Sequence, residues 1–259
     1  MKLVREMGEY EQDRGVGITG ICIIPCYNES KRLSPVSFIE FIKTNPHIRF
    51  LFVNDGSSDD TLTILTKITA ECSRFHLLNL GKNYGKAEAV RLGMIHAYEN
   101  FESDFIGFWD ADLATPLYEI PSFIDQAVEN NFDIVTGLRL MRLGAEVKRN
   151  RKRHYLGRIF ATVVSTMIDL PVYDTQCGAK LFKRSVIPVL FNDVFITKWF
   201  FDVEILARYI QYLGKDNAIN KIYEYPLFKW VDIGGSKLKI KDFITAPFEL
   251  RKIKRKYLT

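Results

Sequence analysis

Two aspartates one residue apart, Asp110 and Asp112, directly follow the apolar run from Phe105 to Trp109. This run is rich in aromatic residues and predicts a buried strand, which would deliver both carboxylates to its carboxyl end, where α/β sheets bind ligands. Along an extended chain, residues i and i+2 point the same way, so both carboxylates can aim at one hard cation. Such a cation can hold the two phosphates of a nucleotide, and we therefore interpret the pair as a metal–diphosphate site.

A second interpretation is that these aspartates only cap the next helix. Thr115 and Pro116 follow them and are typical of a helix start. An Asp-x-Asp pair is short and occurs often by chance, so this stretch alone does not decide between a cap and a binding site. The decision depends on the rest of the chain.

Composition limits the class of protein. The chain has 259 residues, of which 47% are hydrophobic and 26% charged, which is enough for one large α/β domain with its own core. The net charge of +5 is modest and the cations gather in a few stretches, which favours a local anionic partner over nucleic acid. Four cysteines without a Cys-x-x-Cys pair, and no signal peptide, predict a reduced cytoplasmic setting. No window reaches the roughly 18 unbroken apolar residues of a membrane span, so we expect that the chain does not cross a membrane by itself.

Strands and helices alternate regularly up to residue 138. Strands are predicted at 18–24, 49–53, 75–80, 105–109 and 133–138, with helical segments between them. This alternation predicts a single, mostly parallel sheet covered by helices on both faces. Three of the strands are followed by charged side chains, namely Asp55, then Lys82 and Lys86, then Asp110 and Asp112. The carboxyl ends of parallel strands share one edge of a sheet, so this placement favours a nucleotide site there.

The loop from Gly81 to Lys86 contains two glycines and two lysines and precedes a predicted helix. Backbone N–H groups at a helix N-terminus form a cradle for anions, and lysines add charge to it. The spacing matches neither a Walker loop nor a Gly-x-Gly-x-x-Gly fingerprint, which disfavours a P-loop kinase and a dinucleotide enzyme. After the second strand, Gly56 permits a tight turn, and Asp55 before it can accept hydrogen bonds from a base or ribose.

Beyond residue 138 the character of the chain changes. A basic stretch from Arg139 to Arg158 precedes an apolar segment at 159–168 that is too short to span a membrane. This segment suits a helix packed in the core, or one that rests in a lipid interface behind a cationic collar. The tail from Ile244 to Tyr257 alternates basic and apolar residues and fits either a solvated helix or a helix on an anionic membrane.

Charged residues also lie among apolar ones in the second half of the chain. Asp174 and Lys180 are interleaved with small and apolar residues. A predicted helix at 198–213 carries Asp202 and Glu204, which are two positions apart and therefore lie on different faces. Whichever carboxylate faces inward must be paired or functional, because a buried bare charge is costly. A favourable interaction of Asp202 with the helix dipole is the alternative.

Short motifs recur along the chain in a defined order. They are Pro25–Glu29, Asn54–Ser58, Asn83–Lys86, Asp110–Asp112, Asp174–Gly178 and Trp199–Glu204. In order and spacing they resemble family 2 glycosyltransferases, most of all the branch of dolichyl-phosphate β-glucosyltransferases and polyprenyl-phosphate glycosyltransferases. Several ordered motifs together are far more specific than any one of them.

The resemblance implies a GT-A fold with a Rossmann-like nucleotide-binding half. It also implies a UDP-sugar donor, UDP-glucose first, a divalent Mg²⁺ or Mn²⁺ ion, a polyprenyl or dolichyl phosphate acceptor, and inversion at the anomeric carbon. Carried over position by position, the residues that would hold the uridine are Pro25, Tyr27, Glu29 and Asp55.

The remaining assignments from the resemblance concern phosphates and metal. Lys86 would help to position the nucleotide, and Asp110 would serve the ribose side and the metal, with Asp112 as the firmer metal ligand. In the lipid-phosphate branch, arginines after the fifth strand grip the acceptor phosphate, and Arg139 and Arg153 stand in that region here.

Asp174 and Asp202 complete the set of candidate catalytic residues. An inverting transfer needs a leaving diphosphate whose developing charge is neutralised and an attacking oxygen held in line. The oxygen of a lipid phosphate is already anionic and needs little general base. A sugar hydroxyl as acceptor needs a carboxylate such as Asp202 to take its proton.

The acceptor stays open at this point. Relatives in this branch commonly carry a membrane-spanning segment at one end. We expect this chain either to work as a peripheral protein at the cytoplasmic membrane face, through its collar and tail, or to glycosylate a cell-surface or soluble glycan. A silent nucleotide-sugar-binding protein is disfavoured by the intact carboxylates. We predict a flexible arm at 1–16 and one domain at 17–259, with a nucleotide-sugar half at 17–138 and an acceptor half at 139–259.

Overall fold

The structure is a computed structural model that describes residues 17–148, 151–231 and 240–259, with the backbone alone at 151–156 and 240–244. The predicted arm at 1–16 lies outside the described residues and stays a prediction.

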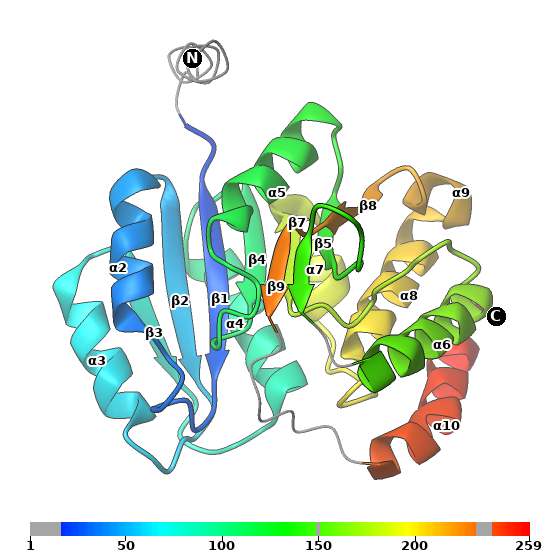
Figure 1. The fold of residues 1–259 in the computed structure, drawn as a ribbon, viewed down its shortest axis with the longest axis horizontal. Helices are drawn as coiled ribbons and strands as arrows, with labels where there is room; N and C mark the ends of the chain where they lie inside the picture. The colour runs from blue at the N-terminus through cyan, green and yellow to red at the C-terminus, as the bar shows by residue number, and fades with distance from the viewer. Residues whose placement is uncertain (1–16, 149–150, 232–239) are drawn as a thin grey trace.

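A seven-stranded sheet organises the molecule (Figure 1). Its strands are β1 (Gly20–Cys26), β2 (Ile48–Asn54), β3 (Phe75–Asn79), β4 (Phe105–Trp109), β5 (Ile134–Leu138), β7 (Ala179–Lys183) and β8 (Ile222–Pro226). Their spatial order is β3-β2-β1-β4-β7-β5-β8, and β7 is antiparallel to both of its neighbours. All the other pairs in this sheet are parallel, so the predicted mostly parallel sheet is confirmed. The sequence did not predict β7, nor the small parallel sheet of β6 (Glu146–Lys148) and β9 (Lys229–Val231).

Helices cover both faces of the sheet. One face packs against α2 (Pro35–Thr44), α3 (Thr61–Glu71) and α5 (Glu119–Glu129), and the other against α4 (Lys86–Asn100), α7 (Ile187–Phe191) and α8 (Phe201–Leu213). The remaining helical segments are α6 (Arg151–Ile168), η1 (Arg184–Val186), α9 (Lys215–Ala218) and α10 (Ile240–Tyr257). In β1, Ile21 and Ile23 enter one core cluster while Cys22 and Ile24 enter the other. A strand buried on both faces is expected when helices connect parallel strands.

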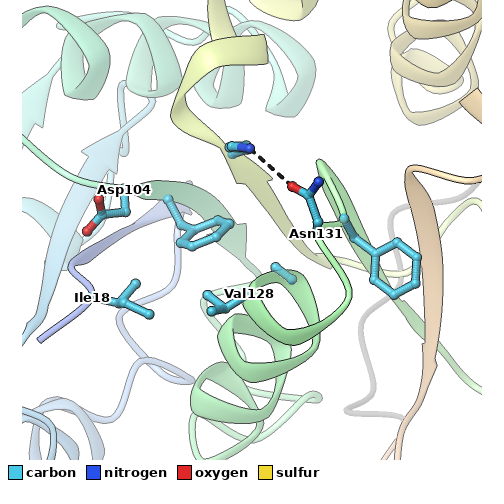
Figure 2. A pocket seen from close by; sticks show the side chains of 8 residues that line it. Ile18, Asp104, Val128 and Asn131 are labelled. Atoms are coloured by element: carbon cyan, nitrogen blue, oxygen red, sulfur yellow. Dashed lines mark hydrogen bonds between the residues drawn. The ribbon is translucent and has the colours of Figure 1, made fainter. Parts of the chain in front are cut away.

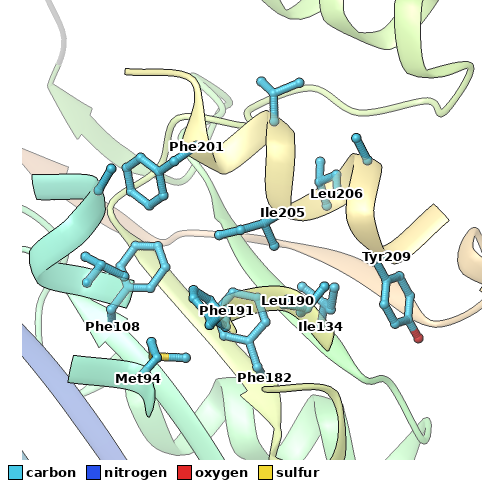
Figure 3. Close-up of a cluster of buried hydrophobic side chains, with 14 of the residues drawn as sticks. Met94, Phe108, Ile134, Phe182, Leu190, Phe191, Phe201, Ile205, Leu206 and Tyr209 are labelled. Carbon is cyan, nitrogen blue, oxygen red and sulfur yellow. The ribbon is translucent and has the colours of Figure 1, made fainter. Parts of the chain in front are cut away.

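Figure 3 shows the core on the α8 side of the sheet, where side chains of three strands meet three helices. Phe182 of β7 stacks on Phe108 of β4 with ring centroids 6.1 Å apart, and it meets Phe191 of α7 edge to face at 5.3 Å. Phe201, in the first turn of α8, lies 6.0 Å from Phe108. These contacts fix the start of α8 against the carboxyl end of β4, which is where the candidate site begins.

The C-terminal helix α10 packs against α8 and α6 (Figure 1). Its buried residues are Ala246, Leu250, Ile253 and Tyr257. Packing within the protein therefore uses the apolar stripe of the tail, and the charged face of α10 points outward. In α6 the apolar segment is divided, because Val164 is fully buried whereas Ile159 is 63% exposed. None of the helices in the described part of the chain is long and apolar enough to span a membrane.

Candidate active site

The loops after β1, β2 and β4 lie next to one another at one edge of the sheet. β1 pairs in parallel with β2 on one side and with β4 on the other. The carboxyl ends of these strands therefore bring Glu29, Asp55 and Asp112 to the same edge. This confirms the predicted placement of the acidic residues at one edge.

Asp110 is held by a lysine and by a glycine. Its carboxylate Oδ1 lies 2.5 Å from Nζ of Lys86, the first residue of α4, and its N–H donates to the Gly178 carbonyl at 3.0 Å. A Cβ on Gly178 would lie 1.8 Å from Oδ2 of Asp110, so only glycine leaves room for this carboxylate. Burial lowers the pKa of Lys86, but the carboxylates of Asp110, Asp202 and Asp112 outweigh it, and the net shift is upward. Lys86 is therefore a fixed cation among carboxylates.

Asp112 lies in a turn and not in an extended segment. β4 ends at Trp109, and the N–H of Leu113, a residue with φ of 54°, donates to the Asp110 carbonyl at 3.1 Å. The predicted i and i+2 alignment along an extended strand is therefore wrong, because the chain turns as soon as it leaves the sheet. Oδ1 of Asp112 accepts a hydrogen bond from the N–H of Ala114 at 3.1 Å. Helix α5 begins only at Glu119, so neither aspartate caps it, and the cap interpretation is wrong as well.

The two aspartates nevertheless influence each other. Burial raises the pKa of Asp112, the negative charge of Asp110 raises it further, and Arg32 and Lys86 act in the opposite direction. Two carboxylates close enough to repel are stabilised by a cation between them. Mg²⁺ and Mn²⁺ prefer oxygen ligands and often take only one or two protein carboxylates, with phosphates as further ligands, so Asp110 and Asp112 fit such an ion. Among the described residues, no group of three or more His, Cys, Asp or Glu side chains could hold a metal.

Asp55 anchors the loop that follows β3. Its carboxylate is 2% exposed and accepts hydrogen bonds from the N–H groups of Tyr84 at 2.7 Å and Gly85 at 2.9 Å, and from the side-chain amide of Asn83 at 3.1 Å. The predicted anion cradle therefore binds a carboxylate of the protein itself. Gly56 allows this approach, because a Cβ there would lie 2.3 Å from the backbone of Lys82. Direct contact of Asp55 with a base stays a prediction.

The motif after β1 contains an ion pair that the sequence did not predict. Oε2 and Oε1 of Glu29 accept hydrogen bonds from Nε and Nη2 of Arg32 at 2.8 and 2.6 Å. The Glu29 N–H donates to Oγ1 of Thr61 at 2.8 Å, which ties this loop to the start of α3. Pro25 lies in β1 and Tyr27 follows it, both partly exposed at the carboxyl edge. Their contact with uridine stays a prediction.

Asp202 forms an ion pair with a buried lysine, Lys180. Oδ1 of Asp202, in the first turn of α8, lies 2.6 Å from Nζ of Lys180, the second residue of β7. The lysine is 2% exposed and also donates to the carbonyls of Cys177 at 2.6 Å and Thr175 at 3.0 Å. Burial raises the pKa of Asp202, and the cations of Lys180 and Lys86 only partly offset this. Since Lys86 and Asp110 also act on Asp202, all three belong to one charged cluster.

Glu204 has a structural role. Fully buried, it accepts hydrogen bonds from the N–H of Ile196 at 2.9 Å, from Nη2 of Arg208 at 2.8 Å and from the hydroxyl of Tyr257 at 2.8 Å. It thereby joins α8 to the loop before it and to the C-terminal helix. Of the two carboxylates on α8, Asp202 faces the site and Glu204 faces the interior.

Arg139 is already paired with an aspartate. Its Nε and Nη2 donate to the two carboxylate oxygens of Asp174 at 2.6 and 2.7 Å, and its guanidinium lies 5.3 Å from the Trp230 ring. Burial opposes the charge of Arg139, but the Asp174 carboxylate outweighs it and raises the pKa of the guanidinium. The Asp174 N–H donates to Glu224 at 2.7 Å. The side chain of Arg153, in the first turn of α6, lies outside the described part of the chain.

A small hollow of about 290 Å³ lies at the opposite edge of the sheet (Figure 2). Figure 2 shows Ile18, Val128 and Asn131 around it. It lies at the amino ends of β1, β4 and β5 and contains none of the candidate site residues. Its charged residues have partners of their own, since Lys183 contacts Asn131, and Asp104 accepts a hydrogen bond from the N–H of Thr19.

Comparison with known proteins gives consistent results. Residues 21–191 match the family model described as Glycosyl transferase family 2. The chain is 33% identical to the dolichyl-phosphate beta-glucosyltransferase ALG5C of Trichomonas vaginalis, over 89% of this chain and 69% of that protein. It is 30% and 28% identical to the dolichyl-phosphate beta-glucosyltransferases of Saccharomyces cerevisiae and Homo sapiens, over 97% and 92% of this chain and 78% and 75% of theirs.

Solved structures support the fold. A crystal structure of glucosyl-3-phosphoglycerate synthase from Mycobacterium tuberculosis with Mn²⁺ and UDP-glucose superposes with a TM-score of 0.63, at 16% identity, over 95% of this chain and 80% of that chain. Another structure of that enzyme, with UDP, gives a TM-score of 0.63 at 15% identity, over 92% of this chain and 80% of that chain. The predicted GT-A fold is confirmed.

Proposed function

The chain belongs to glycosyl transferase family 2, and we propose that it transfers a hexose, most readily glucose, from a UDP-sugar to a polyprenyl or dolichyl phosphate with inversion of the anomeric carbon. The observation that carries the donor half is the cluster of Asp110, Asp112, Lys86 and Asp202 at the carboxyl edge of the sheet. The choice of a lipid phosphate as acceptor is supported by the dolichyl-phosphate beta-glucosyltransferases that match over most of this chain.

Within this proposal Asp112 and Asp110 would hold Mg²⁺ or Mn²⁺, which would neutralise the charge that develops on the leaving diphosphate. Mn²⁺ and UDP-glucose are present together in a structural neighbour, which supports this choice of cofactor and donor. Lys86 adds a cation fixed beside Asp110. The residues proposed to surround the uridine are Pro25, Tyr27, Glu29 and Asp55, at the ends of β1 and β2.

The proposed acceptor sets what the remaining residues do. A phosphate oxygen is already anionic, so the reaction needs no strong base. Asp202 would then hold Lys180 and Lys86 in place by its charge and would not need to accept a proton. Asp174 binds Arg139 along the single edge that Nε and Nη2 form, and Nη1, which makes no hydrogen bond within the described residues, would reach the acceptor phosphate. Arg153 would be a second ligand of this phosphate, as its position in the sequence predicts.

Peripheral contact with the cytoplasmic face of a membrane is part of this proposal, and it would involve the acceptor half. Neighbouring helices α6 and α10 expose apolar side chains, Ile159 at 63%, Val163 at 51% and Phe248 at 69%. Five exposed cations of α10 lie on the same helix as Phe248; they are Arg251, Lys252, Lys254, Arg255 and Lys256. Each cation near an anionic surface contributes about 1 kcal/mol.

The acceptor is tested by comparing three compounds with UDP-glucose and Mn²⁺ at equal concentration: dolichyl phosphate, dolichol and 3-phosphoglycerate. The proposal predicts transfer to dolichyl phosphate alone. Transfer to phosphoglycerate and not to the lipid would contradict the lipid acceptor. Release of UDP without any glucosylated product would redirect the search to glycan acceptors.

A further inference from the structure

Arg32 lies beside the candidate site, and the sequence predicts no role for it. It follows β1, while Asp112 follows β4, and these two strands are parallel neighbours with Ile23 opposite Phe108. The loops that leave them therefore run side by side, and Arg32 lies within electrostatic range of Asp112. Arg32 thus acts on Asp112, whereas Lys86 forms its ion pair with Asp110.

The contacts of Arg32 fix the orientation of its guanidinium. Nε and Nη2 are both used on the carboxylate of Glu29, at 2.8 and 2.6 Å, which fixes the plane of the guanidinium. Within the described part of the chain, Nη1 makes no hydrogen bond, and the side chain keeps 26% of its surface exposed. A guanidinium held along one edge and open along the other is preorganised for a second oxyanion.

We propose that Arg32 binds the diphosphate of the nucleotide, as a second cation besides Lys86, and that Glu29 positions the Arg32 guanidinium. This inference rests on the proposed function, because it assigns a ligand atom within the same donor site. The ligand class is a nucleoside diphosphate, whose oxygens carry the negative charge that Arg32 can neutralise. Arg32 then stabilises the leaving group, and Glu29 positions the guanidinium of Arg32.

The test distinguishes contact of Arg32 with the phosphates from contact with the nucleoside. Uridine, UMP and UDP are titrated calorimetrically, with Mn²⁺, into the wild-type chain, Arg32→Met and Lys31→Met. Lys31 is the exposed neighbour of Arg32, so its removal changes the net charge equally without touching the pair. Thermal unfolding by circular dichroism shows whether each variant is folded.

The expected result is a loss of UDP affinity in Arg32→Met of roughly 10- to 100-fold, as for a charged hydrogen bond, with uridine affinity unchanged and Lys31→Met like the wild type. A Glu29→Gln variant, which keeps the cation but loosens its aim, is expected to lose a smaller part of the UDP affinity. Arg32→Lys is expected to restore only part of it, since lysine lacks the fork.

Two results would overturn the inference. One is a UDP affinity of Arg32→Met equal to that of the folded wild-type chain. The other is an equal loss for uridine, UMP and UDP, which would assign Arg32 to the nucleoside. If the wild-type chain binds no UDP at all, the proposed donor is wrong and the inference falls with it, so the two failures are distinguishable.

Discussion

Gly178 and Asp110 are in such close contact that the carboxylate occupies the space of a missing side chain. A Cβ on Gly178 would lie 1.8 Å from Oδ2 and 2.3 Å from Cγ of Asp110. The same two residues are joined through the backbone by a hydrogen bond of 3.0 Å. The motif around Gly178 therefore fixes the position of Asp110, one of the two proposed metal ligands, without supplying a ligand itself.

Gly178→Ala is expected to disable the site while leaving the fold intact. The methyl group must push the Asp110 carboxylate aside, and a misplacement of about 1 Å in an active site lowers the transfer rate about 100-fold. Overpacking a protein core typically costs roughly 1–3 kcal/mol of unfolding free energy. Only the end of a side chain has to move here, so we expect a loss near the lower end of this range. Transfer assays and urea unfolding measure the two effects.

A matched control is Gly107→Ala, in which the new Cβ would lie 2.6 Å from the backbone carbonyl of Lys180. Here the backbone itself must shift, so stability should fall more than in Gly178→Ala. A Gly178→Ala enzyme with the wild-type transfer rate would show that the position of Asp110 does not matter.

The pair of Arg139 and Asp174 should make a large contribution to stability. Their side chains are only 12% and 9% exposed, and removal of one partner strands a buried charge. Arg139→Met is expected to lower the free energy of unfolding by about 3–5 kcal/mol. Arg142→Met, at an exposed position nearby, should change it by less than about 0.5 kcal/mol. Equal unfolding curves for Arg139→Met and the wild type would contradict the structural role of the pair.

Asp202→Asn distinguishes the two kinds of acceptor. A general base contributes about 10²- to 10⁴-fold to a transfer rate. With dolichyl phosphate as acceptor no base is required, and the variant should lose much less than that, since asparagine can still accept a hydrogen bond from Lys180. A loss of the full magnitude, restored at high pH, would identify Asp202 as a base and favour a hydroxyl acceptor.

The sequence predicts the nucleotide-binding half well because its signals are local. Each strand up to Leu138 is a short apolar run that ends in polar residues, and the helices between them have apolar residues at helical spacing. The acceptor half is harder to predict because its signals are non-local. Strand β7 contains Lys180, which is buried, whereas lysine normally marks a solvent-facing position. Its partner Asp202 is 22 residues away, so no short window shows that the lysine is neutralised.

The site shows the same division. The positions of Asp55, Asp110 and Asp112 follow from the strand ends, whereas their partners depend on how loops approach one another. The sequence predicts Arg139 as a phosphate ligand, but it does not predict the pairing with Asp174, which spans 35 residues and leaves no trace in either motif. Arg32 had a local signal, its spacing of three residues from Glu29 directly after a strand.

The stability of the chain in acid should depend on Asp59. Slight burial raises the pKa of Asp59, but hydrogen bonds from Ser30 and Thr61 outweigh it and lower the pKa to about 2. The unfolded pKa is about 3.9, so the stabilising contribution is fully present above about pH 5 and is lost as the pH falls from there towards 2. Urea unfolding should show a difference between the wild type and Asp59→Asn that is constant from pH 7 to about 5 and shrinks below pH 4. A difference independent of pH down to 3 would exclude this ionisation.

The most direct test of the central claim is the rate at which radiolabelled glucose passes from UDP-glucose to dolichyl phosphate, compared in the wild type and Asp112→Asn with Mn²⁺ present. The account predicts label in the organic phase with the wild-type chain, and a rate at least about 100-fold lower in a folded Asp112→Asn variant, because charge on the leaving diphosphate is no longer neutralised. Equal rates in the two proteins would contradict the assignment of the metal–diphosphate site to Asp110 and Asp112.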